Sequence, residues 1–419
     1  MARPTPFRIE VSDSDLDWIT ERVRTTRLPT GRDLPADEIW KSWGLPVEYA
    51  RKLKDFWVNE YDWRRVERKL NDELEQYTMP IDHRGEDLTL HFVHHRSPAK
   101  DAIPLLIVHG WPGSVFEMKP IIRHLTHPTS PDQQAYHVVV PSLPGFGFSS
   151  YPSKPCSPLE MPDILCKLMT SLGYSRFMAQ GGDWGAQIVR ILATRYPTHC
   201  PAVHLNCVVN GPPNPLRQPI ACLRLLLAYV AGGWGLDEYE KRMLGRMKWF
   251  LEYEAGSSAI QGTKPLTVSY GLTDSPFGMM CWLREKLEGA VGEGFEISLE
   301  DSITWAMPYI INGSPGHAEI YKWMPKGDEQ SLMKALSVPI PSQVSFGASI
   351  FPNDVVYIPR WWAEGSVAQN ITFWKQHEKG GHFPCFEVPE VLAEDIRTFT
   401  GALDKSTIDV LSGSNWMLE

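Results

Sequence analysis

Apolar residues follow a helical period in the first part of the chain and change to a strand period before residue 95. Three early stretches place apolar side chains three or four residues apart, which predicts amphipathic helices. These stretches are Leu16, Ile19 and Val23; Tyr49, Leu53, Phe56 and Trp57; and Trp63, Val66, Leu70 and Leu74. After the turn at residues 83–85, Leu88, Leu90 and Phe92 alternate with polar residues, as in one strand of a hairpin.

Beyond this region the pattern becomes one of apolar strands separated by helices. Buried strands alternating with helices indicate a parallel sheet that is covered on both faces. Strands are expected at 103–108, 138–140, 177–180 and 203–207, and helices at 116–125 and 159–172. The alternation stops after Val209 and returns with strands at 342–347 and 371–374, followed by a helix through Leu392, Ile396 and Phe399.

The interruption predicts how the chain is divided. A helical block between two halves of a parallel sheet is expected to form a lid over the carboxyl ends of the strands, where ligands bind in such folds. We therefore expect an N-terminal extension, the first half of the sheet, a lid, and the second half of the sheet with a loosely held tail from residue 403. The boundaries are 1–95, 96–209, 210–337 and 338–419.

The stretch Gly181-Gly182-Asp183-Trp184-Gly185 stands between the strand at 177–180 and a helical pattern that begins at Ile188. Small residues two before and two after Asp183 suit a sharp turn whose central residue has a strained backbone. This pattern predicts the nucleophile elbow of the α/β-hydrolase fold, with Asp where most such proteins have Ser. The alternative is an ordinary strand-to-helix turn, in which Asp caps the helix.

An aspartate at the elbow would change the chemistry. A serine attacks the carbonyl carbon of an ester or amide, whereas a carboxylate displaces a leaving group from a saturated carbon and becomes an ester itself. Water must then hydrolyse that ester on Asp183. Suitable substrates are epoxides and alkyl halides.

His382 and Asp354 are the predicted partners of Asp183. His382 follows two glycines between the last strand and the last helix, and histidine can accept a proton from water near neutral pH. Asp354 follows the strand at 342–347 and can orient the imidazole. The chain order Asp183, Asp354, His382 is the nucleophile–acid–histidine order of α/β-hydrolases. The alternatives are a structural histidine and a turn-forming Asn353-Asp354 pair.

The proposed chemistry needs hydrogen-bond donors for the oxyanion on Asp183 and a proton donor for the oxygen of the opening epoxide. Backbone N–H groups of Trp111, in the loop after the strand at 103–108, and Trp184 are expected to form the oxyanion hole. A tyrosine hydroxyl could protonate the oxygen of an opening epoxide. Spacing does not choose among the lid candidates Tyr229, Tyr239, Tyr253, Tyr270, Tyr309 and Tyr321.

Composition limits the partners and the compartment. A net charge of −9 disfavours nucleic acid and anionic membranes. Seven cysteines without C-x-x-C pairs, a polar N-terminus and the absence of a long apolar run favour a soluble cytoplasmic protein without a transmembrane segment. The histidines His91, His94 and His95 match a metal site poorly. We expect no metal, no cofactor, and a homodimer that the N-terminal region could help to form.

The chain resembles the microsomal type of epoxide hydrolase, in a soluble, fungal-like form, from Phe7 to about Leu403. The resemblance rests on residues 61–64 and 79–82, His109-Gly110-Trp111-Pro112-Gly113-Ser114, residues 141–149, Gly181-Gly182-Asp183-Trp184-Gly185, Thr263-Lys264-Pro265, residues 272–276 and Gly380-Gly381-His382-Phe383. It implies that Asp183 is the nucleophile, His382 the base and Asp354 the acid. It also implies that Tyr321 activates the epoxide oxygen, and it places Phe383 at the substrate pocket.

One position departs from the family. The resemblance implies a second lid tyrosine shortly before Thr263-Lys264-Pro265, where this chain has Ser257, and Tyr253 lies one helical turn earlier. We expect both residues near the substrate. A single phenol suggests a large substrate, or one whose own hydroxyl takes part, in a biosynthetic rather than a detoxifying role. Alternatives to epoxide hydrolysis are epoxide-opening cyclisation in secondary metabolism, haloalkane dehalogenation and, against the intact triad, ligand binding without catalysis.

Overall fold

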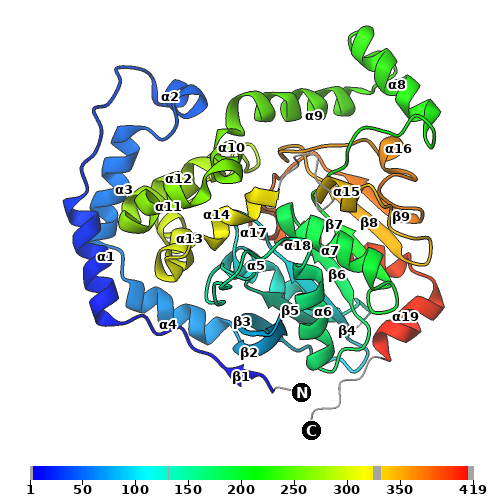
Figure 1. The fold of residues 1–419 in the computed structure, drawn as a ribbon, viewed down its shortest axis with the longest axis horizontal. Helices are drawn as coiled ribbons and strands as arrows, with labels where there is room; N and C mark the ends of the chain where they lie inside the picture. Colours follow the sequence, from blue (N-terminus) through cyan, green and yellow to red (C-terminus); the bar gives the residue numbers. More distant parts are fainter. Residues whose placement is uncertain (1–2, 131, 324–331, 414–419) are drawn as a thin grey trace.

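A nine-stranded sheet forms the centre of the protein, with the order β1-β2-β3-β5-β4-β6-β7-β8-β9 (Figure 1). The computed structural model describes residues 3–130, 132–323 and 332–413. The strands are β1 Thr5–Pro6, β2 Gln76–His83, β3 Glu86–His95, β4 Ile103–Val108, β5 Tyr136–Pro141, β6 Met178–Gly181, β7 Ala202–Leu205, β8 Ser345–Ile350 and β9 Ile371–Gln376. All neighbouring pairs from β5 to β9 are parallel, whereas β1, β2 and β3 add antiparallel. The predicted α/β-hydrolase fold is confirmed.

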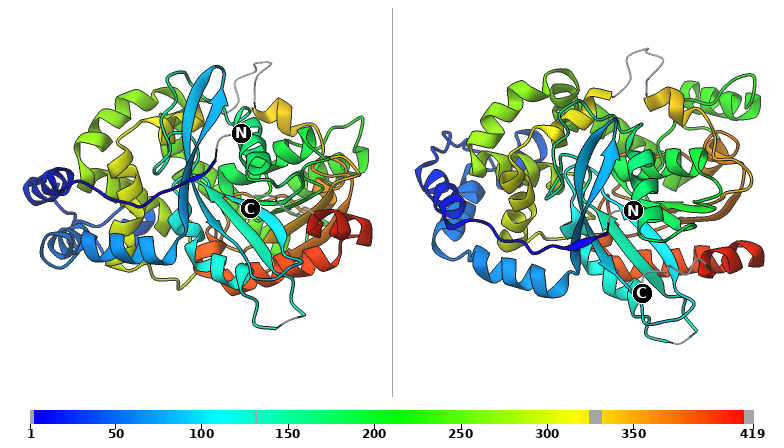
Figure 2. Two further views of the ribbon diagram at one scale, coloured as in Figure 1. Left: turned by 90° about the horizontal axis from the view of Figure 1, so that it is seen from below. Right: turned by 60° about the horizontal axis from the view of Figure 1, so that its bottom comes forward.

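Helices cover the parallel strands on both faces. They are α5 Val115–Thr126, α6 Met161–Ser171, α7 Asp183–Arg195, α16 Arg360–Ala363, α17 Pro384–Glu387, α18 Pro389–Gly401 and α19 Lys405–Ser412. Helix α6 packs with α7, and α5 packs with α17 and α18. In Figure 2 the green helices α6 and α7 lie on one side of the sheet and the red helices α18 and α19 on the other.

The N-terminal extension consists of helices beside the lid and a hairpin at the sheet edge (Figures 1 and 2). Its helices are α1 Asp13–Thr25, α2 Ala36–Ser42, α3 Val47–Asn59 and α4 Trp63–Glu73. Ser12 begins α1 by accepting a hydrogen bond from the N–H of Asp15. Strands β2 and β3 join through Arg84 and Gly85, whose positive φ angles of 54° and 76° match a two-residue hairpin turn. The sequence pattern missed α2, which is a short helix.

The lid is built from helices between β7 and β8. They are α8 Pro219–Val230, α9 Glu238–Trp249, the π-helix η1 Phe250–Glu254, α10 Gly256–Thr263, α11 Pro265–Asp274, α12 Pro276–Glu288, α13 Leu299–Asn312, α14 Gly316–Glu319, the 3-10 helix η2 Ile320–Trp323 and α15 Leu332–Leu336. Within the predicted lid, residues 324–331 lie outside the described residues. The division into four regions stays a prediction, although the described lid helices fall within 210–337.

Two predictions near the end of the chain differ from the structure. The tail from residue 403 contains helix α19, because Asp404 caps it at the N–H of Thr407 and Leu411 is fully buried; residues 414–419 are not described. The strand expected at 342–347 runs from 345 to 350 instead. It starts late because the chain first makes a turn, in which the N–H of Val344 donates to the carbonyl of Pro341.

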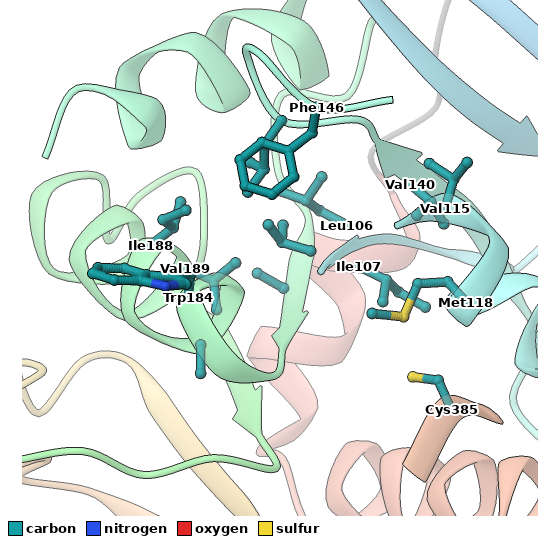
Figure 3. Packing of buried hydrophobic residues seen from close by; sticks show 14 of the residues in the cluster. Leu106, Ile107, Val115, Met118, Val140, Phe146, Trp184, Ile188, Val189 and Cys385 are labelled. Carbon is teal, nitrogen blue, oxygen red and sulfur yellow. The ribbon is translucent and has the colours of Figure 1, made fainter. Parts of the chain in front are cut away.

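Buried apolar residues fix the elbow between sheet and helix. Trp184, Ile188 and Val189 of α7 pack with Leu106 and Ile107 of the central strand β4 (Figure 3). Because Trp184 directly follows Asp183 and is only 2% exposed, the elbow is anchored in the core on its helical side.

Candidate active site

Asp183 stands at a backbone position that few residues adopt. Its φ angle is +50°, in the left-handed region, at the start of α7. The turn is possible only with glycine on both sides. A Cβ atom at Gly185 would lie 1.9 Å from the carbonyl oxygen of Val108, and one at Gly181 would lie 2.6 Å from the carbonyl of Gly185. The predicted elbow is therefore present, and it presents the carboxylate of Asp183 at the carboxyl edge of the sheet.

The structure brings His382 between the two predicted carboxylates. Its Nε2 lies 3.3 Å from Oδ2 of Asp183, and its Nδ1 lies 2.6 Å from Oδ1 of Asp354. The loop after β9 is held in place because the N–H of His382 donates to the carbonyl of Ala290. Both His382 and Asp354 are 4% exposed, whereas the Asp183 side chain keeps 21% exposure. Only the predicted nucleophile is thus accessible to a ligand.

The charge on His382 depends on both carboxylates. Burial of the imidazole disfavours its charge, but Asp354 and Asp183 outweigh burial and raise the pKa of His382 well above its ordinary value. Forming an ester at Asp183 would remove one of these two negative charges. The neutral imidazole, which can accept a proton from water, is therefore favoured once Asp183 has reacted.

The loop after β4 contacts the other oxygen of Asp183. The N–H of Trp111 donates to Oδ1 at 2.7 Å. A Cβ atom at Gly110 would lie 2.1 Å from that oxygen and 2.6 Å from the backbone nitrogen of Trp184, so the loop passes close to both. Of the two N–H groups predicted for an oxyanion hole, that of Trp111 is bonded to the carboxylate, and the backbone nitrogen of Trp184 lies close to the same loop.

Helix α13 of the lid holds this loop in position. The indole N–H of Trp305 donates to the carbonyl of Pro112 at 2.5 Å, and the hydroxyl of Tyr309 donates to the carbonyl of Gly113 at 2.6 Å. The bond between Trp111 and Pro112 is cis. Contacts from the lid, as well as the sheet, therefore orient the N–H of Trp111. The sequence of the loop did not predict these lid contacts.

Tyr321 of η2 packs against the two tryptophans that adjoin Asp183. Its ring meets Trp111 and Trp184 edge-on at centroid distances of 5.5 Å and 5.1 Å. The side chains of Trp184 and Ser258 lie close to its hydroxyl. Burial, followed by the charge of Asp183, raises the pKa of Tyr321 well above its ordinary value. The phenol therefore keeps its proton at neutral pH and can donate it to a ligand oxygen.

The three predicted pocket residues have different surroundings. Phe383 is 2% exposed and contacts the rings of His382 and Trp305. Ser257 is 6% exposed on α10. Tyr253 is 66% exposed in the π-helical turn η1, so the structure does not place it at the predicted pocket. Because the wider turn precedes α10, Tyr253 and Ser257 do not stack as neighbours on one α-helix.

Glu117 is a buried acid that the sequence pattern did not single out. It stands three residues after Ser114, the N-cap of α5, a spacing typical of a capping box. In the structure Glu117 is 5% exposed, and its carboxyl group packs against Gly113. Burial, together with the charges of Asp183 and Glu387 and against that of His382, raises the pKa of Glu117 to about 8. Glu117 is therefore protonated at neutral pH.

Glu117→Gln is expected to stabilise the protein in a pH-dependent way. The unfolded chain releases the Glu117 proton near pH 4.5 and the folded chain near pH 8, so this residue reduces stability as pH rises through that window. At pH 7 the cost is on the order of 3 kcal/mol. Thermal unfolding should show a higher Tm for the variant at pH 8 and an equal Tm at pH 4. Glu238→Gln, at a fully exposed position, is the matched control, and an equal Tm for Glu117→Gln and wild type at pH 8 would contradict the expectation.

Two groups of side chains within the described ranges could approach a metal ion. Potential ligand atoms lie within 4.8 Å of one another in Cys207, Asp354 and His382, and in His83, Cys156 and Glu160. In the first group Asp354 is bound to Nδ1 of His382. In the second, Glu160 is paired with Arg84, whose charge opposes a cation. Neither group is assigned as a metal centre, and the absence of a metal stays a prediction.

No helix in the described parts of the chain is both long and apolar enough to cross a membrane.

The chain is similar to known proteins both in sequence and in structure. The family model described as "Epoxide hydrolase N terminus" matches residues 4–118, and "alpha/beta hydrolase fold" matches residues 103–237. The chain is 34% identical to a putative epoxide hydrolase of Stigmatella aurantiaca, over 94% of this chain and 84% of that protein. It is 32% identical to epoxide hydrolase 1 of Sus scrofa, over 96% and 89%. The structure of Aspergillus niger epoxide hydrolase matches with a TM-score of 0.79, at 28% identity, over 95% of this chain and 96% of that one.

Proposed function

The chain belongs to the epoxide hydrolase family, and from that premise we propose that it hydrolyses an epoxide to a vicinal diol through an ester on Asp183. The observation that carries the proposal is the position of His382, in contact with Asp183 through Nε2 and with Asp354 through Nδ1. A nucleophile, a base and an orienting acid in this order are what ester formation and ester hydrolysis require.

The first step uses Asp183 and Tyr321. The N–H of Trp111 holds Oδ1, so Oδ2 is the oxygen available to attack an epoxide carbon. As the bond from Oδ2 to carbon forms, the carbon–oxygen bond of the epoxide breaks. The phenol of Tyr321 gives its proton to the released oxygen, which becomes a hydroxyl group. Asp183 is now a neutral ester.

The second step uses His382 and the backbone donors. Water attacks the ester carbon of Asp183 while Nε2 of His382 takes one of its protons. The negative charge develops on Oδ1, where the N–H groups of Trp111 and Trp184 stabilise it. Collapse of this intermediate breaks the bond between the ester carbon and Oδ2, and the released alkoxide takes the proton of the new carboxyl group, which gives the diol and restores the carboxylate. The proton that His382 carries at the start passes to the phenolate of Tyr321 after the first step, directly or through water, and the proton from water replaces it. The sum is therefore epoxide plus water to diol.

The structure gives grounds for ranking the alternatives. A haloalkane offers no oxygen for the buried phenol of Tyr321 to protonate, so dehalogenation leaves this group without a role. A binding protein would not need a base in contact with a carboxylate nucleophile. Cyclisation, in which a substrate hydroxyl replaces water, uses the same residues. Ser257 favours a functionalised substrate, and we propose an intermediate of natural-product biosynthesis rather than a foreign compound.

Product analysis with wild-type protein tests the proposal. We expect a panel of epoxides to yield vicinal diols that are one water heavier than the substrates. Tyr321→Phe should lower kcat by roughly 10²-fold, because the leaving alkoxide loses its proton donor. Halide release from alkyl halides with no epoxide opening would support the dehalogenase. A cyclic product with the mass of its substrate would support the cyclase.

We further propose a homodimer in a reducing compartment such as the cytoplasm. Helix α8 is apolar on most sides and lies apart from the body of the protein in Figure 1. Large apolar side chains around it are more than half exposed: Leu216, Ile220, Leu223, Leu226, Tyr229 and Val230. A second copy of the chain could cover them. Sedimentation of Leu223→Glu against wild type tests whether the dimer forms through this surface.

All seven cysteines are free, which supports a reducing compartment.

A further inference from the structure

Two polar side chains of the lid are buried without satisfying their hydrogen-bonding atoms. Both amide atoms of Gln261, Oε1 and Nε2, and Nε2 of His317 have no hydrogen-bond partner in the part of the chain that the structure describes. Gln261 is 0% exposed and His317 is 2% exposed. A buried amide or imidazole N–H without a partner costs about 1–3 kcal/mol. Such atoms are expected to have a partner that the described residues do not supply.

Helix α10 brings Gln261 to the side of Tyr321. Ser258 lies close to the Tyr321 hydroxyl, and a Cβ atom at Gly262 would lie 3.2 Å from the Tyr321 carbonyl. These two positions are four residues apart and therefore share one face of the helix. Ser257 and Gln261 are also four residues apart, so they lie next to Ser258 and Gly262 on the surface of the helix. Both Ser257 and Gln261 are buried. Gln261 thus lies on a helix that packs directly against η2, the element that carries the phenol proposed to protonate the epoxide.

His317 of α14 contacts Trp111, whose ring is a neighbour of the Tyr321 ring. It stands four residues before Tyr321, and both residues contact Trp111, whose indole N–H donates to Nδ1 of His317 at 3.2 Å. Burial lowers the pKa of His317 to about 3, so the ring is neutral. Because Nδ1 accepts a hydrogen bond, the single proton of the neutral ring is on Nε2. His317 therefore carries an N–H donor that lacks an acceptor among the described residues.

Ser257 adds a further polar group to the part of the lid that is formed by α10, α14 and η2. Serine has a hydroxyl group and a much smaller side chain than the tyrosine that the family resemblance implies at position 257, and it stands one helical turn from Gln261. This part of the lid therefore carries hydrogen-bond donors on His317 and Gln261 and an acceptor on Gln261. The hydroxyl of Ser257 can donate and accept. Helix α10 packs against both α14 and η2, so these groups belong to one packed part of the lid.

We propose that Gln261, His317 and Ser257 form a subsite that binds a hydroxyl or carbonyl oxygen carried by the epoxide substrate. The substrate class is therefore an oxygenated epoxide rather than a plain hydrocarbon epoxide. This inference rests on the proposed function and narrows it. The subsite also explains why polar atoms are kept in a buried part of the lid.

A matched pair of substrates tests the subsite. Phenylglycidol and β-methylstyrene oxide share a carbon skeleton and differ by one hydroxyl group. We expect wild-type kcat/KM to favour phenylglycidol by about 10-fold or more, since the lost hydrogen bonds leave buried groups unpaired. Gln261→Met, of similar size, and Ser257→Tyr should each bring this ratio close to one. Ile260→Ala, on the exposed side of the same helix, should keep the wild-type ratio.

The subsite can be judged separately from catalysis. Asp183→Ala lacks the nucleophile, so calorimetry can compare its affinity for the two diols that correspond to these epoxides. Tighter binding of the hydroxylated diol, lost on adding Gln261→Met, supports the subsite even if neither epoxide is turned over. Equal affinities, or a kcat/KM ratio that neither Gln261→Met nor Ser257→Tyr changes, would overturn it. Absence of diol with intact binding selectivity would instead count against the proposed hydrolysis.

Discussion

Asp183→Ala is expected to lower kcat/KM for epoxides by at least about 10⁴-fold, because no other carboxylate can replace the nucleophile. Oδ1 of Asp354 accepts hydrogen bonds from His382 and from the N–H of Val355. Glu117 is protonated at neutral pH, since its pKa is raised to about 8. The effect should appear in kcat, since the substrate pocket itself remains.

The control for this variant is a substitution that removes an exposed aspartate. Asp163, on α6, has a side chain that is 43% exposed and paired with Arg195. Asp163→Ala should leave kcat/KM within about twofold of wild type. Circular dichroism should give the same spectrum for both variants and wild type. Retention of more than a few per cent of wild-type activity by a folded Asp183→Ala protein would show that another group attacks the epoxide.

His382→Gln should separate the two chemical steps. Ester formation needs Asp183 and Tyr321, whereas ester hydrolysis needs a base, so we expect one equivalent of epoxide to be consumed before turnover slows by about 10³-fold or more. The intact mass should increase by the mass of the whole epoxide, and peptide mapping should place the adduct on Asp183.

The choice of glutamine follows from the two carboxylates beside His382. Glutamine keeps a polar side chain next to Asp183 but can neither accept the proton of water nor carry the imidazolium charge. His124→Gln replaces a partly exposed imidazole and serves as the control, with no burst and no adduct expected. Steady turnover at the wild-type rate by His382→Gln would show that another group activates water.

The triad was predictable because its signals are local. Glycine at 181 and 185 is required by backbone contacts shorter than 3 Å, and Asp183 is the one charged residue between an apolar strand and an apolar helix. His382 and Asp354 follow strands that the sequence pattern also indicated, although β8 runs from 345 to 350 rather than from 342 to 347. The parallel order of the sheet then brings the three loop ends together.

The remaining parts of the site depend on contacts between distant segments. Nothing in the sequence around Gly113 indicates that Tyr309 binds its carbonyl, and nothing around Gln261 indicates that the amide is buried without a partner among the described residues. Tyr253 was expected at the pocket by counting along an α-helix, and the π-helical turn η1 changes that count. Helix α19 was missed because its stability comes from a cap and from the buried Leu411 rather than from a long apolar stripe.

The most direct test of the ester on Asp183 is a single turnover of wild-type protein in water enriched in oxygen-18. The ester mechanism predicts that the diol from the first turnover carries unlabelled oxygen, because that oxygen comes from the carboxylate of Asp183. The label should enter Asp183 instead and reach the diol only in later turnovers. Labelled diol in the first turnover, with no label in Asp183, would mean that water attacks the epoxide directly and would contradict the ester mechanism.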